Sequence, residues 1–162
     1  IKDYEKFLGR RKPIDESLEK LASKVKDMKS SIWLIHNPPS ECGLDHCASG
    51  HKPGSKAVRA FIEKHQPLMT VHGHIHESPE YSGVWRADIG NTVAINAGQL
   101  EQSLNYFMFE LDGNKILHLE HSKFGKGMDI GRVSHGYNQD FHQTKRWDPE
   151  RQEEQDGTKH TN

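Results

Sequence analysis

Two short apolar runs, separated by an amphipathic segment, constrain the fold of this chain most strongly. The runs occupy residues 31–36 and 68–72, and Gly73 closes the second. Such continuous apolar runs are typical of strands covered on both faces rather than of edge strands. Ser55 is a suitable N-cap for a helix over residues 56–65, between the runs. Strand, helix and strand within about forty residues form a βαβ unit, which predicts parallel strands.

The flanking segments complete the predicted α/β fold. Pro13 opens a helix that we expect to end near Lys29, because apolar residues recur at spacings of three and four. These residues are Leu18, Leu21, Ala22, Val25 and Met28. After Pro79, β-like segments and the turn pair Asp112-Gly113 predict an antiparallel meander. We therefore expect an α/β fold in which a βαβ unit is followed by an antiparallel meander.

Residues 127–162 differ in character from the rest of the chain. They show no sustained periodicity, and residues 150–162 contain no aliphatic side chain. A segment of this kind buries too little apolar surface to fold by itself. We expect a domain over residues 1–126 and a polar, loosely ordered tail over residues 127–162.

Charge and composition limit the classes of partner. The chain of 162 residues has 22 basic and 23 acidic side chains, so its net charge of -1 creates no global attraction for nucleic acid or an anionic membrane. Its apolar runs are too short to span a bilayer, and it has no secretory signal pattern. Two cysteines cannot build a disulfide framework, which favours a reduced, cytoplasmic location. Association between several copies of the chain stays open.

Three of the 12 histidines follow the ends of the two predicted strands. His36 ends the first strand, and His74 and His76 lie just beyond the second. Both strand ends of a βαβ unit meet at one edge of the sheet, about 5 Å apart for neighbouring strands or about 10 Å with one strand between them. Neutral imidazole is a common ligand for divalent transition metals. The three side chains could therefore converge on one or two metal ions.

These motifs resemble those of the calcineurin-like metallophosphoesterases. Residues 35–39 read IHNPP, and residues 71–77 read VHGHIHE. In that family an isolated His follows one core strand and a Gly-His-x-His motif follows the next. Residues 54–59 and 89–98 look like a bacterial and archaeal branch of the family. The resemblance covers residues 31–111, about half of the chain.

The resemblance implies a role for each of the three histidines. His36 and His74 match ligands of the second metal ion, and His76 matches a ligand of the first. The family uses two divalent ions, manganese, iron or zinc, and a metal-bound hydroxide attacks a phosphomonoester or phosphodiester. The implied fold is the C-terminal half of a four-layer α/β/β/α sandwich. Weaker candidates, for contact with the phosphate ester substrate, are His46, His51 and Asn96.

One part of the family pattern is missing. The family's N-terminal half supplies an Asp-x-His, a bridging Asp and a Gly-Asn-His, and none of these precedes His36. We therefore expect the catalytic residues upstream of Ile1 and the missing N-terminal half of the same enzyme as a partner. Without that half, one side of the sheet would expose strand edges.

Two other interpretations stay open. Cys42, His46, Cys47 and His51 lie in one loop and have the side chains of a structural zinc site, although their spacing is unusual for one. The chain could also be a non-catalytic binding or scaffold domain that keeps vestigial metal-site histidines. The sequence upstream of Ile1 and the metal content of the purified chain would distinguish these functions.

Overall fold

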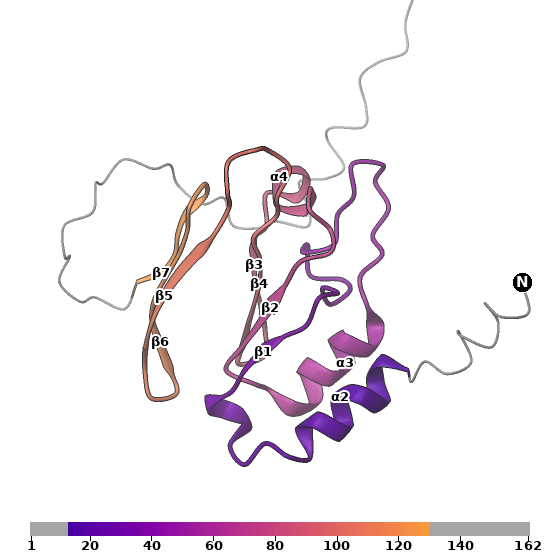
Figure 1. Cartoon of the computed structure of the whole chain (residues 1–162), viewed down its shortest axis with the longest axis vertical. Helices are drawn as coiled ribbons and strands as arrows, with labels where there is room; N and C mark the ends of the chain where they lie inside the picture. The colour runs from indigo at the N-terminus through magenta and orange to yellow at the C-terminus, as the bar shows by residue number, and fades with distance from the viewer. Residues whose placement is uncertain (1–12, 130–162) are drawn as a thin grey trace, which may run out of the picture.

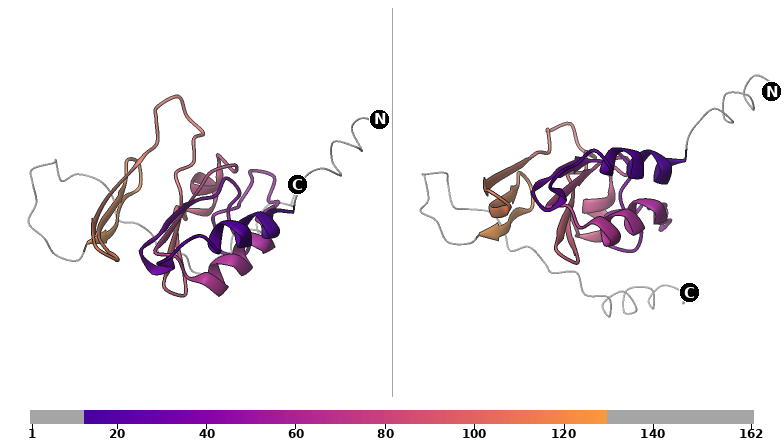
Figure 2. Two further views of the ribbon diagram at one scale, coloured as in Figure 1. Left: turned by 60° about the horizontal axis from the view of Figure 1, so that its bottom comes forward. Right: turned by 90° about the horizontal axis from the view of Figure 1, so that it is seen from below.

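Two β-sheets, with helices packed on the outer face of the first, form a mixed α/β fold (Figure 1). The structure is a computed structural model and describes residues 13–129. Its elements are α2 (Ile14–Ala22), η1 (Met28–Ser30), β1 (Ile32–Leu34), α3 (Lys56–His65), β2 (Met69–His72), α4 (Ser78–Ser82), β3 (Arg86–Ile89), β4 (Thr92–Asn96), β5 (Phe107–Asp112), β6 (Lys115–His121) and β7 (Gly125–Asp129). Figure 2 shows the layers: α2 and α3, then the first sheet, then the second. The predicted α/β class is confirmed.

The first sheet has the strand order β1-β2-β4-β3. Strands β1 and β2 are parallel neighbours, with Ile32 opposite Met69, and α3 connects them. Strand β4 continues the parallel pairing, whereas β3 is antiparallel to β4. The predicted βαβ unit is therefore present, and its two strand ends lie at the spacing of direct neighbours.

The expectation that the first strand is covered on both faces is wrong. Strand β1 is an edge strand, and the side chain of Leu34 is 83% exposed. Trp33 points toward the helices and is buried, while Ile32 packs in the core between the two sheets. Leu34 shares the face of Ile32 because side chains alternate along a strand. The second sheet leaves this position uncovered.

The first helix is shorter than predicted, because α2 ends at Ala22 and not near Lys29. The Ser23 hydroxyl donates to the carbonyl of Lys20, and the chain then turns, with Val25 N–H donating to the carbonyl of Ala22. Side chain to backbone bonds of this kind compete with helical hydrogen bonds. Val25 and Met28 still pack against the helix-side core. The apolar residues therefore keep helical spacing beyond Ala22, although a turn and the 3-10 helix η1 carry them instead of α2.

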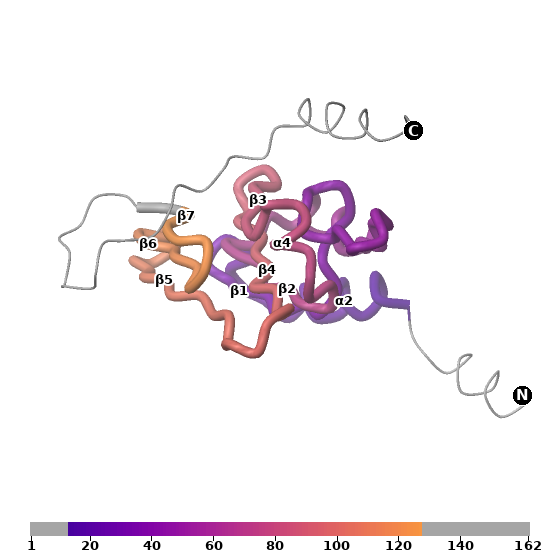
Figure 3. The backbone as a smooth tube through the Cα atoms, turned by 90° about the horizontal axis from the view of Figure 1, so that it is seen from above, coloured from indigo at the N-terminus to yellow at the C-terminus, as the bar shows by residue number. Residues whose placement is uncertain are grey.

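The second sheet is antiparallel, with the order β5-β6-β7. The predicted turn at Gly113, where φ is 57°, joins β5 to β6. Strand β7 continues to Asp129, past the domain boundary expected after residue 126. The rest of the predicted tail, and residues 1–12, lie outside the described residues. Figure 3 shows that β7 lies on the β3 side of the first sheet and β5 on the side of β1 and β2.

Two apolar clusters hold the layers together. One lies between the helices and the first sheet and includes Phe61, Ile62 and Trp33. The other lies between the sheets and includes Met69, Ile95 and Leu119. None of the helices within residues 13–129 combines the length and apolar character needed to cross a lipid bilayer.

Candidate functional site

A pair of histidines lies at the carboxyl ends of β1 and β2. The Nδ1 atom of His74 is 3.2 Å from the Nε2 atom of His36. Their ring centroids are 5.0 Å apart and the rings are nearly perpendicular, at 71°. Both side chains are exposed to solvent. Open α/β sheets place their ligands at this edge, so the pair is accessible where a ligand is expected.

The backbone at His74 has an unusual conformation. Its φ angle is 65°, in the left-handed region that favours glycine. The N–H of Ile75 donates to the carbonyl of Gly73 at 2.7 Å, which closes a tight three-residue turn around His74. The N–H of Gly73 donates to the carbonyl of His36 at 3.0 Å and extends the pairing of β1 with β2. Strained backbone of this kind is concentrated at functional sites.

His76 is exposed but does not join this pair. Among residues 13–129, its side chain makes no hydrogen bond or ring contact with His36 or His74. Its carbonyl accepts the N–H of Gln99 at 2.8 Å. A Cβ atom at Gly98, where φ is 62°, would lie 2.8 Å from that carbonyl oxygen, so glycine is required there.

The side chain of His72 is buried and contacts the backbone on both sides of His36. Its Nδ1 atom contacts the carbonyl oxygens of Ile35 and Asn37 at 2.9 and 3.0 Å, so this nitrogen donates. Its Nε2 atom accepts from the hydroxyl of Thr70 at 2.8 Å. Burial lowers the pKa of His72 to about 4, against the opposing effect of the two carbonyls. The neutral ring therefore fixes the segment on both sides of His36.

Asn96, predicted as a weak substrate contact, is a buried link between loops. Its Nδ2 atom donates to the carbonyls of Leu44 and Ile75 at 3.1 and 3.2 Å, and its Oδ1 atom accepts from Gly98 N–H. These bonds join the loop that carries Cys42 and Cys47, the turn around His74 and the segment after β4. The amide group is thus used inside the fold.

The other two weak candidates lie in the loop before α3. His51 is exposed, whereas His46 is 7% exposed, with both ring nitrogens buried and unpaired among the described residues. Burial lowers the pKa of His46, and the positive charge of Lys52 acts in the same direction. The backbone N–H of His46 donates to the hydroxyl of Ser78, which anchors the loop to α4.

The cysteines of this loop are free thiols. Cys42 contacts the carbonyl of Pro39, and burial raises its pKa to about 11, which disfavours the thiolate that a metal requires. Burial also raises the pKa of Cys47. Within residues 13–129, no three His, Cys, Asp or Glu side chains are grouped so that they could hold a metal ion, in this loop or at the strand ends.

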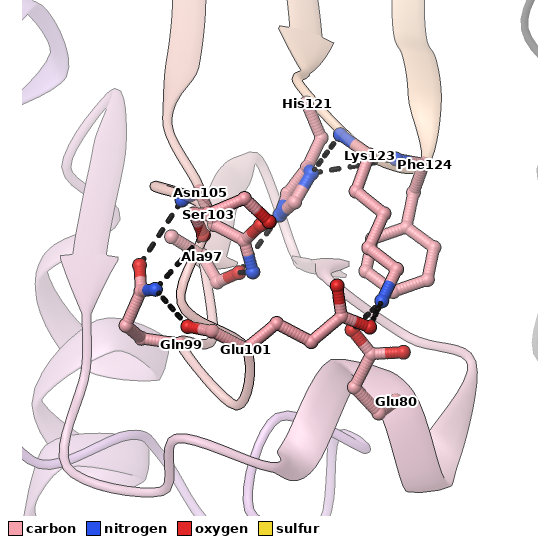
Figure 4. Close-up of polar contacts among 9 residues, drawn as sticks. All are labelled: Glu80, Ala97, Gln99, Glu101, Ser103, Asn105, His121, Lys123 and Phe124. Atoms are coloured by element: carbon pink, nitrogen blue, oxygen red, sulfur yellow. Dashed lines mark hydrogen bonds and ion pairs between the residues drawn. The ribbon is translucent and has the colours of Figure 1, made fainter.

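The second sheet is tied to the segment that follows Asn96 (Figure 4). The Nε2 atom of His121 lies 2.8 Å from the carbonyl of Ala97, while its Nδ1 atom accepts the N–H of Lys123. The Lys123 ammonium pairs with Glu80 at 2.6 Å and with Glu101 at 2.8 Å. No pattern in the sequence singled out His121 as a candidate. The structure adds that it anchors the loop whose Gln99 binds the carbonyl of His76.

The residues present fit part of a transition-metal site. Two exposed imidazoles with ring nitrogens 3.2 Å apart are of the donor type that transition metals bind, and further ligands would have to come from outside this pair. No protein-family model, no curated protein and no solved structure matches the chain. Fold and site together define a mixed α/β protein with a histidine pair at the carboxyl edge of its parallel strands. The resemblance to calcineurin-like metallophosphoesterases stays a prediction.

Proposed function

We propose that this chain is the C-terminal part of a metal-dependent phosphoesterase that hydrolyses phosphomonoesters or phosphodiesters. The observation that carries the proposal is the contact between His36 and His74, with His74 held in a left-handed conformation. Residues held in sparsely populated backbone conformations cluster at ligand sites, which supports this assignment. The proposal includes the remaining layers of a four-layer sandwich and a cytoplasmic location.

Each residue near the pair has a part in the proposed site. His36 and His74 would hold one divalent ion and His76 the other, with manganese, iron or zinc as the candidates. When bound, the ions would supply Lewis acidity to activate water and to neutralise charge on the phosphoryl oxygens. His72 orients the segment that carries His36 through its bonds to Ile35 and Asn37. This is the positioning that ligand histidines need.

The described histidines cannot complete such a site alone, because they provide no carboxylate. We propose that the missing ligands, and the residue that assists the leaving group, belong to the N-terminal half expected upstream of Ile1. A reading frame that encodes Asp-x-His and Gly-Asn-His before Ile1 would support this part of the proposal. A start codon at that point would contradict it.

The function is tested by the hydrolysis of bis-p-nitrophenyl phosphate, with manganese added, by the intact protein that contains this chain. His74→Ala should abolish turnover while the circular dichroism spectrum stays unchanged. His118→Ala is the matched control, because His118 lies on β6 and contacts Glu120, not the pair. Unchanged turnover in His74→Ala would remove the proposed metal role.

One observation favours a second candidate, a binding or scaffold domain with vestigial histidines. Residues 13–129 assemble no group of three potential ligands, and a partial ligand set binds metal weakly. This function predicts that the intact protein is inactive with every divalent metal while its histidine variants keep full partner binding.

A further inference from the structure

Residues 46–53 form a flap in the loop between β1 and α3. At the base of the flap, the N–H of Gly54 donates to the carboxylate of Asp45 at 2.9 Å. At its tip, Gly50 has a φ of 80°, and its N–H donates to the carbonyl of Cys47 at 2.9 Å, which turns the chain back. The flap therefore leaves and rejoins the fold at one point.

Two hydrogen bonds hold the flap to the N-terminal end of α4. The N–H of His46 donates to the hydroxyl of Ser78 at 3.0 Å, and the N–H of Ala48 donates to the carboxylate of Glu77 at 3.4 Å. Residues 48–52 are exposed, and His46 is the only member of the flap that is buried. The side-chain packing of the flap against the fold therefore depends on the His46 ring.

This ring is buried without a hydrogen-bond partner. His46 is 7% exposed, and within residues 13–129 neither its Nδ1 nor its Nε2 atom has a donor or acceptor. The carbonyl of Gly43, on the same loop, already accepts the hydroxyl of Ser78 at 3.2 Å. Buried polar groups are normally paired, so an unpaired one requires an explanation. Such surroundings tolerate a neutral imidazole far better than a charged one.

The charged groups around the ring do not change this preference. Burial lowers the pKa of His46, and the charge of Lys52 acts in the same direction, against weaker opposing effects of Asp45 and the Gly43 carbonyl. The Asp45 carboxylate accepts the Gly54 N–H, and none of the neighbouring side chains hydrogen-bonds to the ring. The titratable groups on the segments around the ring are Asp45, Cys47, His51 and Lys52 on the loop and Glu77 at the start of α4.

We propose that the flap is a pH-dependent switch, in which protonation of the His46 ring releases residues 46–53 from the N-terminal end of α4. A buried imidazolium without an acceptor is unstable, and opening of the flap brings the ring into water. The pKa of the ring is below 6.5 in the closed flap and ordinary in the open one, so the open state gains population as the pH falls below about 6.5. Opening also frees the carboxylate of Glu77, which directly follows His76 in the chain.

This inference rests on the fold alone and stands even if the proposed phosphoesterase activity fails. Amide hydrogen exchange of the full chain, followed by NMR at pH 7.5 and pH 5.5, tests it. The reporters are the N–H groups at positions 46 and 48, which donate to α4 and its N-cap, and the amides of β4 report global unfolding. After correction for intrinsic exchange, the protection factors of the reporters should fall at least about threefold between the two pH values. Those of β4 should stay higher and follow a different pH dependence.

Variants assign the response to the His46 ring. His46→Phe keeps a buried ring without a titratable nitrogen, so its flap amides should have equal protection at both pH values. His46→Gln, which also lacks a group that titrates in this range, serves the same purpose if the phenylalanine variant does not fold. His51→Gln is the matched control, because it changes an exposed histidine of the same flap and should keep the parent response. Equal protection at both pH values in the parent chain, an unchanged response in the His46 variants, or a fall that only matches that of β4 would overturn the proposal.

Discussion

The Nδ1 atom of His74 lies 3.2 Å from the Nε2 atom of His36, although 38 positions separate the two residues. Parallel pairing of β1 with β2 brings the two segments together, and the bond from Gly73 N–H to the His36 carbonyl extends that pairing to the histidines. Both rings remain exposed at the edge of the sheet. Two imidazoles in this arrangement can share one hydrogen bond or turn toward a common cation.

Because His36 and His74 lie together, we expect both side chains to bind the same metal ion. His36→Ala and His74→Ala should each lower the affinity of the chain for Zn²⁺ by at least about tenfold, which is about 1.4 kcal/mol. His118→Ala should leave the affinity unchanged, since that residue lies on β6. Isothermal titration calorimetry measures all three affinities. Equal affinities for the chain and its His74→Ala variant would exclude the pair as a binding site.

The left-handed backbone at His74 should lower the stability of the folded chain. His74→Gly should raise the free energy of unfolding by about 1 kcal/mol relative to His74→Ala, because only glycine adopts this φ without strain. Gly83 provides the reciprocal control. Its φ is 68° and a Cβ atom there would meet nothing within 4 Å, so Gly83→Ala should cost about 1 kcal/mol through the backbone alone. Urea unfolding of the variants measures these differences.

The buried amide of Asn96 predicts a large loss of stability on truncation. Asn96→Ala leaves the carbonyls of Leu44 and Ile75 without their donor in a buried environment, so it should cost about 2–4 kcal/mol. Asn114→Ala, in the exposed turn between β5 and β6, should cost less than about 0.5 kcal/mol. Chemical unfolding compares the two variants. Similar midpoints would show that the loops do not depend on Asn96.

Gly54 and Gly73 should respond differently to alanine. A Cβ atom at Gly54 would collide with Asp45 and lie 2.6 Å from the Cα of Ser40, so Gly54→Ala should destabilise the fold by about 1–3 kcal/mol. A Cβ atom at Gly73 would lie 3.8 Å from the Nδ1 of His36, which is ordinary contact. Thermal unfolding of Gly73→Ala should therefore stay close to that of the parent chain. The strained turn in this motif belongs to His74 rather than to the glycine before it.

The buried histidines predict a loss of stability in acid. In the folded chain the pKa of His72 is about 4, against an ordinary value of 6.5, so the unfolded chain binds the extra proton between these pH values. Stability should fall as pH drops from about 6.5 to about 4, by about 3 kcal/mol, and this contribution is fully lost below about 4. Burial lowers the pKa of His46 and His121 as well, which adds loss in the same direction.

Urea unfolding at a series of pH values tests this dependence. His72→Gln should flatten the profile between pH 6.5 and 4, because the variant has no imidazole to protonate there. His118→Ala serves as the control and should keep the parent slope. A parent chain whose stability is constant across this window would contradict the prediction.

Sequence patterns predicted the elements that depend on local order. The N-cap at Ser55, whose hydroxyl accepts the N–H of Val58, begins α3 as expected, and Gly113 forms the expected turn. The early end of α2 was missed because Val25 and Met28 keep helical spacing after the helix has stopped. Strand β7 was missed because its residues pair with β6 without an apolar alternation of their own. Local pattern is a reliable guide only where a segment supplies its own contacts.

The sequence alone determined the βαβ unit and the place of His36 and His74 at its edge, because strand, helix and turn preferences act over a few neighbouring residues. Tertiary structure decided which histidines meet. It separated the side chain of His76 from the pair, placed His72 beneath Ile35 and Asn37, and used Asn96 to join three loops. These contacts connect residues 21 to 52 positions apart, and their partners are backbone carbonyls, which every residue carries. Only the packed fold determines which carbonyl each side chain reaches.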